Sequence, residues 1–173
     1  MALVVLKWLL GFDKGRKFCV YCSDVAGAFD RVSAERLTAK LRNLRVPDKW
    51  VKLFASWLRQ REARVIVGGA LSEPVSLADM VFQGTVWGPV LWNVFYKDAR
   101  RPVQDAGFTE TVFADDLNSY KGFSVSVKDE VVLAEGRRCQ ENLHNWGKAN
   151  QVSFDPLKES LHVVARAGGS EEN

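Results

Sequence analysis

Two adjacent carboxylates at the end of an apolar run constrain this chain more than any other feature. Asp115 and Asp116 follow Val112-Phe113-Ala114, a run that is typical of a short strand about to turn back. Side by side, each carboxylate raises the free energy needed to ionise the other. A bound cation relieves that repulsion, and a solvated acidic turn tolerates it. On this segment alone both interpretations stand.

A third acidic residue, Asp24, favours a bound cation over a solvated turn. Asp24 ends another apolar run, Phe18-Cys19-Val20-Tyr21-Cys22-Ser23, which also predicts a buried strand. If the two strand ends lie side by side, three carboxylates meet at one edge of a sheet. Carboxylate oxygens are the ligands that Mg²⁺ prefers, so this edge suits one or two magnesium ions.

The order of the other elements supports such a meeting. The pattern predicts a buried apolar helix over 2–10, ended by Gly11, then the strand 18–24 and helices that begin after Ser33 and Pro47. It then predicts a hairpin of strands 64–67 and 76–82, a helix from Pro89, a strand pair 111–113 and 117–123, a helix over about 127–149 and a strand 161–164. Without the hairpin this order is β-α-β-β-α-β, an α+β, ferredoxin-like antiparallel sheet with helices packed on one face.

Length and composition indicate one domain over residues 1–173, with a core over 18–165 and a polar tail over 168–173. The apolar first ten residues are far shorter than the roughly 20 that a membrane-spanning helix needs. Three cysteines form no disulfide framework and indicate a reducing, intracellular compartment. The spacing of Cys19 and Cys22 suggests a metal or redox site, but residues three apart on a strand point to opposite faces, which excludes that interpretation. Both are instead predicted to be small core residues. His144 and His162 have no neighbours at ligand spacing.

Positive charge gathers in one segment. Residues 40–64 carry eight basic and two acidic residues, whereas the whole chain has a net charge of +3. This segment either follows a phosphate backbone or is the solvated side of amphipathic helices. Within it, Trp50, Leu53, Phe54 and Trp57 are predicted to form an apolar stripe that faces the core.

Four blocks resemble, in order, the motifs of a reverse transcriptase palm of the non-LTR retrotransposon type. They are Ser23–Asp30, Gln83–Asn93 with its glycines at 84 and 88, Phe113-Ala114-Asp115-Asp116, and Phe154–Ser160. Together they span about residues 24–160. The resemblance implies a polymerase palm and RNA-directed DNA polymerase chemistry, with an RNA template, a DNA primer and a dNTP as substrates.

The resemblance also implies roles for single residues. Asp24, Asp115 and Asp116 would be ligands of two Mg²⁺ ions, and Lys158 would act as an acid near the departing pyrophosphate, although a solvated lysine also fits the sequence. Phe29 would lie under the sugar of the nucleotide, unless it is a core aromatic. Gln83 and Gly84 would position the nucleotide against the template.

The same resemblance predicts missing parts. The stretches before Asp24 and after Lys158 are too short to hold complete fingers or a thumb, so the chain is expected to be truncated and not active alone. The alternative is a retroelement-derived, non-catalytic subunit whose protein partners cover the missing fingers and thumb faces. A nucleotidyl cyclase on the same topology fits the motifs less well.

Overall fold

The computed structural model describes residues 2–59, 61–77 and 80–166, so the tail expected over 168–173 lies outside the described residues. The chain forms two compact units. Of the described residues, the first contains 2–24, 99–146 and 154–166, and the second contains 25–59, 61–77, 80–98 and 147–153.

The first unit is built on a four-stranded sheet in the order β6-β7-β1-β8, with all neighbours antiparallel. Its strands are β1 (Arg16–Ser23), β6 (Thr109–Phe113), β7 (Asp116–Ser124) and β8 (Ser160–Val164). Its helices are α1 (Ala2–Phe12), α5 (Arg100–Asp105) and most of α6 (Asp129–Asn150). The predicted strands 18–24, 111–113, 117–123 and 161–164 are therefore confirmed, with ends shifted by two residues at most.

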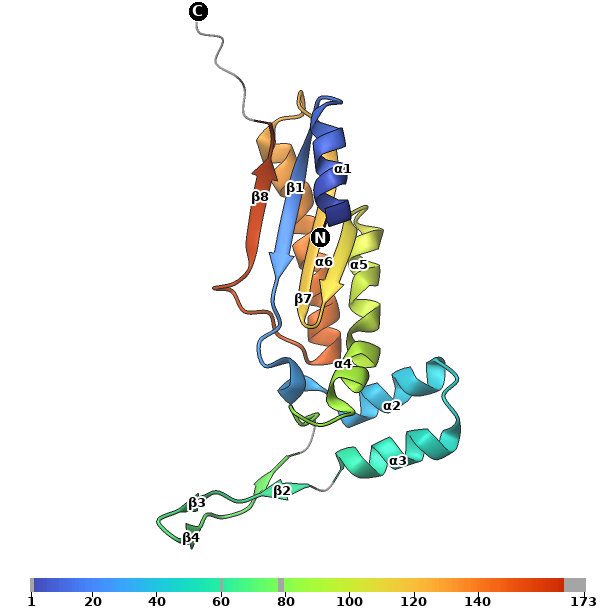
Figure 1. Cartoon of the computed structure of the whole chain (residues 1–173), viewed down its shortest axis with the longest axis vertical. Coiled ribbons are helices and arrows are strands. Elements are labelled where there is room, and N and C mark those ends of the chain that lie inside the picture. The colour runs from blue at the N-terminus through green and yellow to red at the C-terminus, as the bar shows by residue number, and fades with distance from the viewer. Residues whose placement is uncertain (1, 60, 78–79, 167–173) are drawn as a thin grey trace, which may run out of the picture. The chain divides into compact units, whose positions relative to one another are not determined.

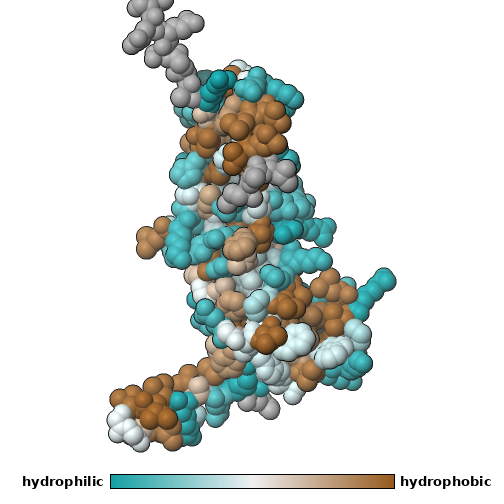
Figure 2. Space-filling view, in the orientation of Figure 1, coloured by the Kyte–Doolittle hydropathy of each residue, from teal (hydrophilic) through white to brown (hydrophobic). Residues whose placement is uncertain are grey.

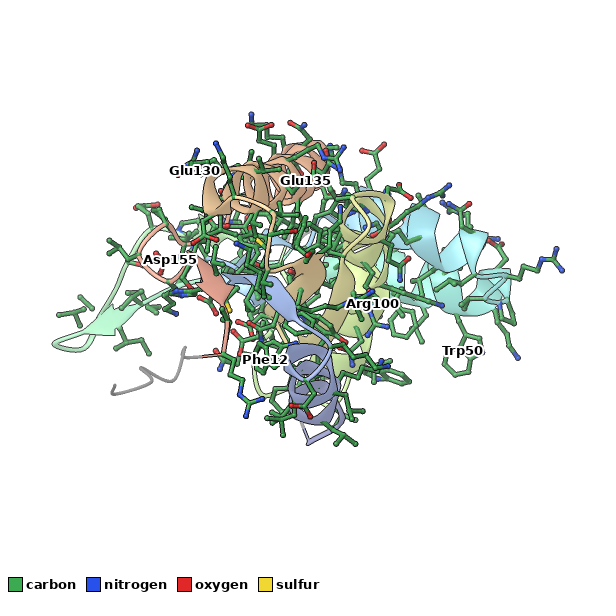
Figure 3. The ribbon with its side chains drawn as sticks, turned by 90° about the horizontal axis from the view of Figure 1, so that it is seen from above. Phe12, Trp50, Arg100, Glu130, Glu135 and Asp155 are labelled. Atoms are coloured by element: carbon green, nitrogen blue, oxygen red, sulfur yellow. The ribbon has the colours of Figure 1, made fainter. Side chains whose placement is uncertain are left out.

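Helices cover both faces of this sheet, so the prediction of helices on one face is wrong. Figure 1 shows α1 in front of the sheet and α6 behind it, and Figure 3, seen from above, places Phe12 of α1 and Glu130 and Glu135 of α6 on opposite sides of the strands. The reason is the alternation along β1. Phe18 and Val20 point toward α1, and Cys19 points toward α6, so both faces are apolar and both need a cover.

The first helix also differs from its prediction. It continues through Gly11 to Phe12, because Gly11 is where the helix approaches Phe18 most closely: a Cβ there would lie 2.8 Å from Cε2 of that ring. Trp8 and Phe12 pack on Phe18 as well, with ring centroids 6.0 and 5.4 Å away. The helix is not buried all round, since the side chains on its outer face are about half exposed: Val5, Leu6, Leu9 and Leu10.

The second unit is mainly helical. It contains η1 (Ala28–Arg31), α2 (Ala34–Asn43), α3 (Asp48–Leu58), α4 (Gly88–Tyr96) and most of η2 (Lys97–Ala99). Ser33 caps α2 as predicted, since its hydroxyl accepts a hydrogen bond from the amide of Arg36. Trp92 and Tyr96 stack in its core with centroids 4.9 Å apart.

Two predictions for this unit are wrong. The hairpin consists of four two-residue strands, β2 (Glu62–Ala63), β3 (Ile66–Val67), β4 (Ala70–Leu71) and β5 (Val75–Ser76). The returning strand predicted over 76–82 therefore continues no further than Ser76 among the described residues, and 78–79 lie outside them. The buried residues of α3 are Val51, Phe54 and Leu58, whereas Trp50 and Leu53 are exposed. The apolar residues of α3 cover a wide arc of the helix, so the spacing fits more than one buried face.

Within the part of the chain that the structure describes, no helix is long and apolar enough to cross a membrane. Cys19 and Cys139 are buried thiols of the sheet and α6, and Cys22 is half-buried on the other face of β1. The interpretation of these cysteines as core residues is confirmed.

Candidate functional site

The carboxylates of Asp24 and Asp116 lie at the same end of the sheet in the first unit. Strands β1 and β7 pair in a register that ends with Ser23 opposite Leu117. Continuing that register by one residue sets Asp24 opposite Asp116, and paired residues of antiparallel strands have Cα atoms roughly 5 Å apart. The hydroxyl of Ser23 also donates to the carbonyl of Leu117 at 3.0 Å and fixes this junction.

Asp115 lies in the turn of the hairpin between β6 and β7. Phe113 pairs with Asp116, so Ala114 and Asp115 alone make the turn, and Ala114 adopts a left-handed backbone with φ 55°. The sequence prediction that the two acids lie where a strand turns back is confirmed. The tight turn holds both carboxylates at the end of the sheet.

The charges of the three acids are coupled. Burial, then the neighbouring carboxylates of Asp115 and Asp24, raise the pKa of Asp116 above its ordinary value, and a hydrogen bond with Asp24 acts in the same direction. An added positive charge would relieve this repulsion.

Lys158 supplies one positive charge. Its ammonium donates to Oδ2 of Asp24 at 2.8 Å, and this hydrogen bond raises the pKa of Lys158. The backbone brings the lysine there, because the amide of Asp155 donates to the carbonyl of Asp24 at 3.0 Å and the amide of Lys158 donates to the carbonyl of Asp155 at 3.1 Å. The segment from Asp155 to Lys158 is therefore hydrogen-bonded to the end of β1.

Glu159, which the sequence analysis missed, anchors the same segment from the other side. Its side chain is only 7% exposed and accepts hydrogen bonds from the Tyr21 hydroxyl, from Nε2 of His144 at 2.8 Å and from Nε2 of Gln140 at 3.3 Å. His144 also stacks on Phe154, with centroids 5.1 Å apart, so its ring contacts both Glu159 and the residues that precede it. The available signal was the four-residue spacing of Gln140 and His144, which places both on one face of α6.

The other predicted site residues lie in the second unit. Gln83 and Gly84 are exposed in the loop before α4, where Gly84 has φ 85° and occupies the left-handed region that favours glycine. The hydroxyl of Thr85 donates to the carbonyl of Phe82 at 2.8 Å and accepts from the amide of Gly88 at 3.1 Å, so this loop is held at its base. Phe29 is half-buried against Trp92, with centroids 6.2 Å apart.

Over residues 2–59, 61–77 and 80–166, no three or more histidine, cysteine, aspartate or glutamate side chains stand closely enough to hold a metal ion. The oxygen donors and the repulsion at Asp116 nevertheless suit a hard divalent cation.

Comparisons with known proteins agree on one family. The family model described as reverse transcriptase (RNA-dependent DNA polymerase) matches residues 8–163. The RNA-directed DNA polymerase from mobile element jockey of Drosophila melanogaster is 30% identical over 155 residues, which are 85% of this chain and 16% of that protein. The retrovirus-related Pol polyprotein from type-1 retrotransposable element R2 of Popillia japonica is 25% identical over 124 residues, which are 72% of this chain and 20% of that protein.

Solved structures show the same fold. Apo telomerase from Candida tropicalis, truncated from its C-terminal domain, superposes with a TM-score of 0.65 at 13% identity and covers 98% of this chain and 36% of that one. Telomerase of the same organism in complex with a fragment of telomeric RNA gives a TM-score of 0.65 at 13% identity over 95% of this chain and 30% of that one. The chain is thus a mixed α+β domain with an antiparallel sheet and spans a fifth or less of the two sequence relatives.

Proposed function

Because this chain belongs to the reverse transcriptase (RNA-dependent DNA polymerase) family, we propose that residues 18–165 form the catalytic palm of an RNA-directed DNA polymerase. Its substrates are an RNA template, a DNA primer and a dNTP. The strand order β8-β1-β7-β6, with antiparallel neighbours, supports the split βαβ, ferredoxin-like topology that we assign to this palm. The observation that carries the proposal is the meeting of Asp24 with Asp116 at one end of that sheet.

Asp24, Asp115 and Asp116 are the proposed ligands of two magnesium ions. Bound there, Mg²⁺ would activate the 3′-hydroxyl of the primer and stabilise the charge that develops on the departing pyrophosphate. The carboxylates must turn toward a shared ion, and rotation about their own side-chain torsions allows this without a change in the paired strands. The raised pKa of Asp116 supports the proposal, because it reports a local excess of negative charge.

Lys158 is the proposed proton donor to the leaving pyrophosphate. Its contact with Asp24 keeps the ammonium charged and holds it beside the carboxylates. An ammonium at that position balances charge as the phosphate bond breaks.

The nucleotide is proposed to contact Phe29, Gln83 and Gly84. Gly84 is exposed and has no side chain, so a nucleotide or template base can approach its backbone closely. The partial burial of Phe29 on Trp92 supports both a packing role and a fixed surface for the sugar.

We also propose that residues 1–173 alone extend a primer weakly or not at all. The jockey and R2 relatives are several times longer than the segment they share with this chain. Polymerisation depends on positioning two substrates, so much of the surface that grips them belongs to the remainder of such proteins.

A chimera tests the catalytic role directly. Residues 8–163 replace the matching segment of the jockey polymerase, and extension of a DNA primer on an RNA template is measured with Mg²⁺ and dNTPs. The chimera should extend the primer, and Asp115→Asn in the same chimera should reduce extension by about a hundredfold or more, the scale of removing one strong electrostatic contact from a transition state. Equal extension with and without that substitution would refute the palm assignment, and exposed Lys128→Gln is the control that should leave extension unchanged.

A second candidate is a non-catalytic subunit that binds another protein. Exposed apolar side chains on the hairpin favour it: Val65, Ile66, Val67, Leu71 and Val75. Figure 2 shows this surface as a brown patch over the hairpin. Apolar patches of this kind are typical of interfaces. Copurification of a stoichiometric protein partner with a chimera that is inactive but folded would favour this candidate.

A further inference from the structure

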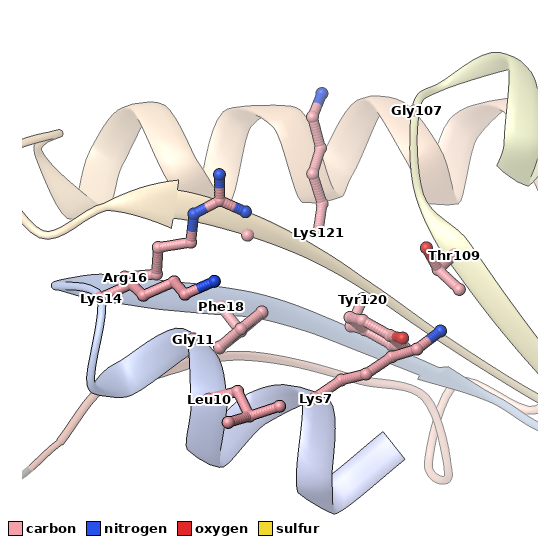
Figure 4. A pocket seen from close by; sticks show the side chains of 11 residues that line it. Lys7, Leu10, Gly11, Lys14, Arg16, Phe18, Gly107, Thr109, Tyr120 and Lys121 are labelled. Atoms are coloured by element: carbon pink, nitrogen blue, oxygen red, sulfur yellow. The ribbon is translucent and has the colours of Figure 1, made fainter. Parts of the chain in front are cut away.

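A basic groove of about 580 Å³ lies in the first unit between α1 and the strands that α1 covers. Its walls include Lys7, Leu10, Gly11 and Lys14 on α1 and the turn after it, and its floor includes Phe18 of β1 and Tyr120 of β7. Figure 4 shows Lys14 and Arg16 at one end and Lys7 beside Tyr120 at the other.

The charge of this groove is one-sided. Four basic residues line it, and among the described residues no acidic side chain does. Lys121 is neutralised by Glu135, with Nζ 2.7 Å from Oε2. Lys7, Lys14 and Arg16 are exposed and form no ion pair within the described part of the chain, which leaves three uncompensated positive charges.

The groove is held by packing that does not involve the cations. Gly11 lies directly on the ring of Phe18, and Trp8 stacks on Phe18 and meets the edge of Tyr120 at 5.8 Å between centroids. The backbone that carries the cations is therefore fixed, and Thr109 also lines the groove. A row of cations on a fixed backbone suits a chain of phosphates.

This groove is separate from the carboxylates. Phe18 lies five residues before Ser23 on β1, and at ~3.4 Å per residue the floor of the groove is roughly 17 Å from the strand end that bears the acids. The two features can therefore act independently.

We propose that this groove binds the phosphodiester backbone of a nucleic acid strand through Lys7, Lys14 and Arg16. This site goes beyond the proposed catalysis, because it needs neither a metal ion nor the carboxylates. Three phosphate contacts should contribute about 2 to the slope of log affinity against log salt concentration for a single strand, at about 0.7 per contact.

The test is fluorescence anisotropy with labelled oligo(U) RNA and oligo(dT) DNA of about 15 nucleotides, measured in EDTA from about 50 to 200 mM salt. The groove variant is Lys7→Gln, Lys14→Gln, Arg16→Gln. The control variant removes the same charge from exposed sites outside the groove: Arg101→Gln, Lys128→Gln and Arg137→Gln.

The groove variant should lose about 2 from the slope, so that affinity falls about 16-fold less over that salt range than in the wild type. The control variant should keep the wild-type slope. Loss of slope with both RNA and DNA supports recognition of the phosphates that the two strands share, and loss with only one of them would contradict a site that binds the backbone alone. Equal losses in the two variants, or an unchanged slope in the groove variant, would overturn it.

Because the chelator removes divalent metal, these outcomes do not depend on the proposed metal site. A failed groove test leaves the chimera experiment untouched, and an inactive chimera leaves the groove test untouched.

Discussion

Replacing Glu159 by glutamine should destabilise the folded chain by about 2 kcal/mol. The carboxylate accepts three hydrogen bonds while almost fully buried. Hydrogen bonds to a charged group contribute roughly 1.5–3 kcal/mol, against about 1 for neutral pairs. A glutamine keeps these contacts only at neutral strength, because Gln140 can turn its amide oxygen toward the new amide but no negative charge remains to strengthen the bonds.

Urea unfolding followed by tryptophan fluorescence measures this loss. The matched control is Glu141→Gln on the exposed side of α6, which should change the free energy of unfolding by less than about 0.5 kcal/mol. If Glu159→Gln also changes the free energy of unfolding by less than about 0.5 kcal/mol, the hydrogen bonds of Glu159 do not anchor the segment that carries Lys158.

Tyr21 provides an independent check of the same network. Burial first, and the hydrogen bond to Glu159 second, raise the pKa of the Tyr21 phenol above its ordinary value. The unfolded chain then ionises this phenol at lower pH than the folded chain, so stability falls as pH rises above about 10. Tyr21→Phe should remove part of that fall, and its double-mutant cycle with Glu159→Gln should give a coupling of about 0.5–3 kcal/mol. A coupling near zero would contradict the contact.

Three further predictions concern packing and charge in the first unit. Gly136→Ala should destabilise by about 1–3 kcal/mol despite the better helix propensity of alanine, because its Cβ would lie 2.7 Å from Sγ of Cys19 and 3.0 Å from Cδ2 of Leu161; a gain in urea midpoint would contradict this. Burial raises the pKa of Cys19 and Cys139 to about 11. At pH 8 both thiols should therefore react with iodoacetamide roughly a hundredfold more slowly than in the urea-unfolded chain, as measured by mass spectrometry of labelled peptides. Equal rates would refute their burial. Asp116→Asn should raise the melting temperature at pH 7 without divalent metal, because the pKa of this carboxyl is raised and its ionisation opposes folding. The gain in melting temperature should shrink as the pH falls and the carboxyl is protonated. A gain that is constant with pH would argue against charge as the cause.

The sequence predicts the ends of the strands well because the acids directly follow them. Asp24 and Asp115 each end an apolar run, and the pairing of β1 with β7 follows from the order of elements. The buried face of a helix is harder to predict when its apolar residues cover a wide arc. On α3 the spacing fits Trp50 and Leu53 as well as Val51 and Leu58, and only packing in the second unit selects the latter pair.

The Glu159 network could not be read from local pattern at all. Tyr21 and Glu159 are 138 residues apart in the chain and meet because β1 and β8 are neighbours in the sheet. A buried glutamate beside a lysine looks, in one sequence, like any solvated charge pair. Its partners are known only once the register of the sheet is known.

The proposed palm depends on a shared divalent-cation site formed by Asp24, Asp115 and Asp116, and Mn²⁺ binding measured by electron paramagnetic resonance tests that site most directly. The wild-type chain should bind Mn²⁺ saturably, Mg²⁺ should compete, and Asp24→Asn or Asp116→Asn should abolish binding. Asp105→Asn, an exposed acid of α5, should leave binding intact. Binding that survives loss of Asp24 and Asp116, or no binding by the wild type, would contradict the account.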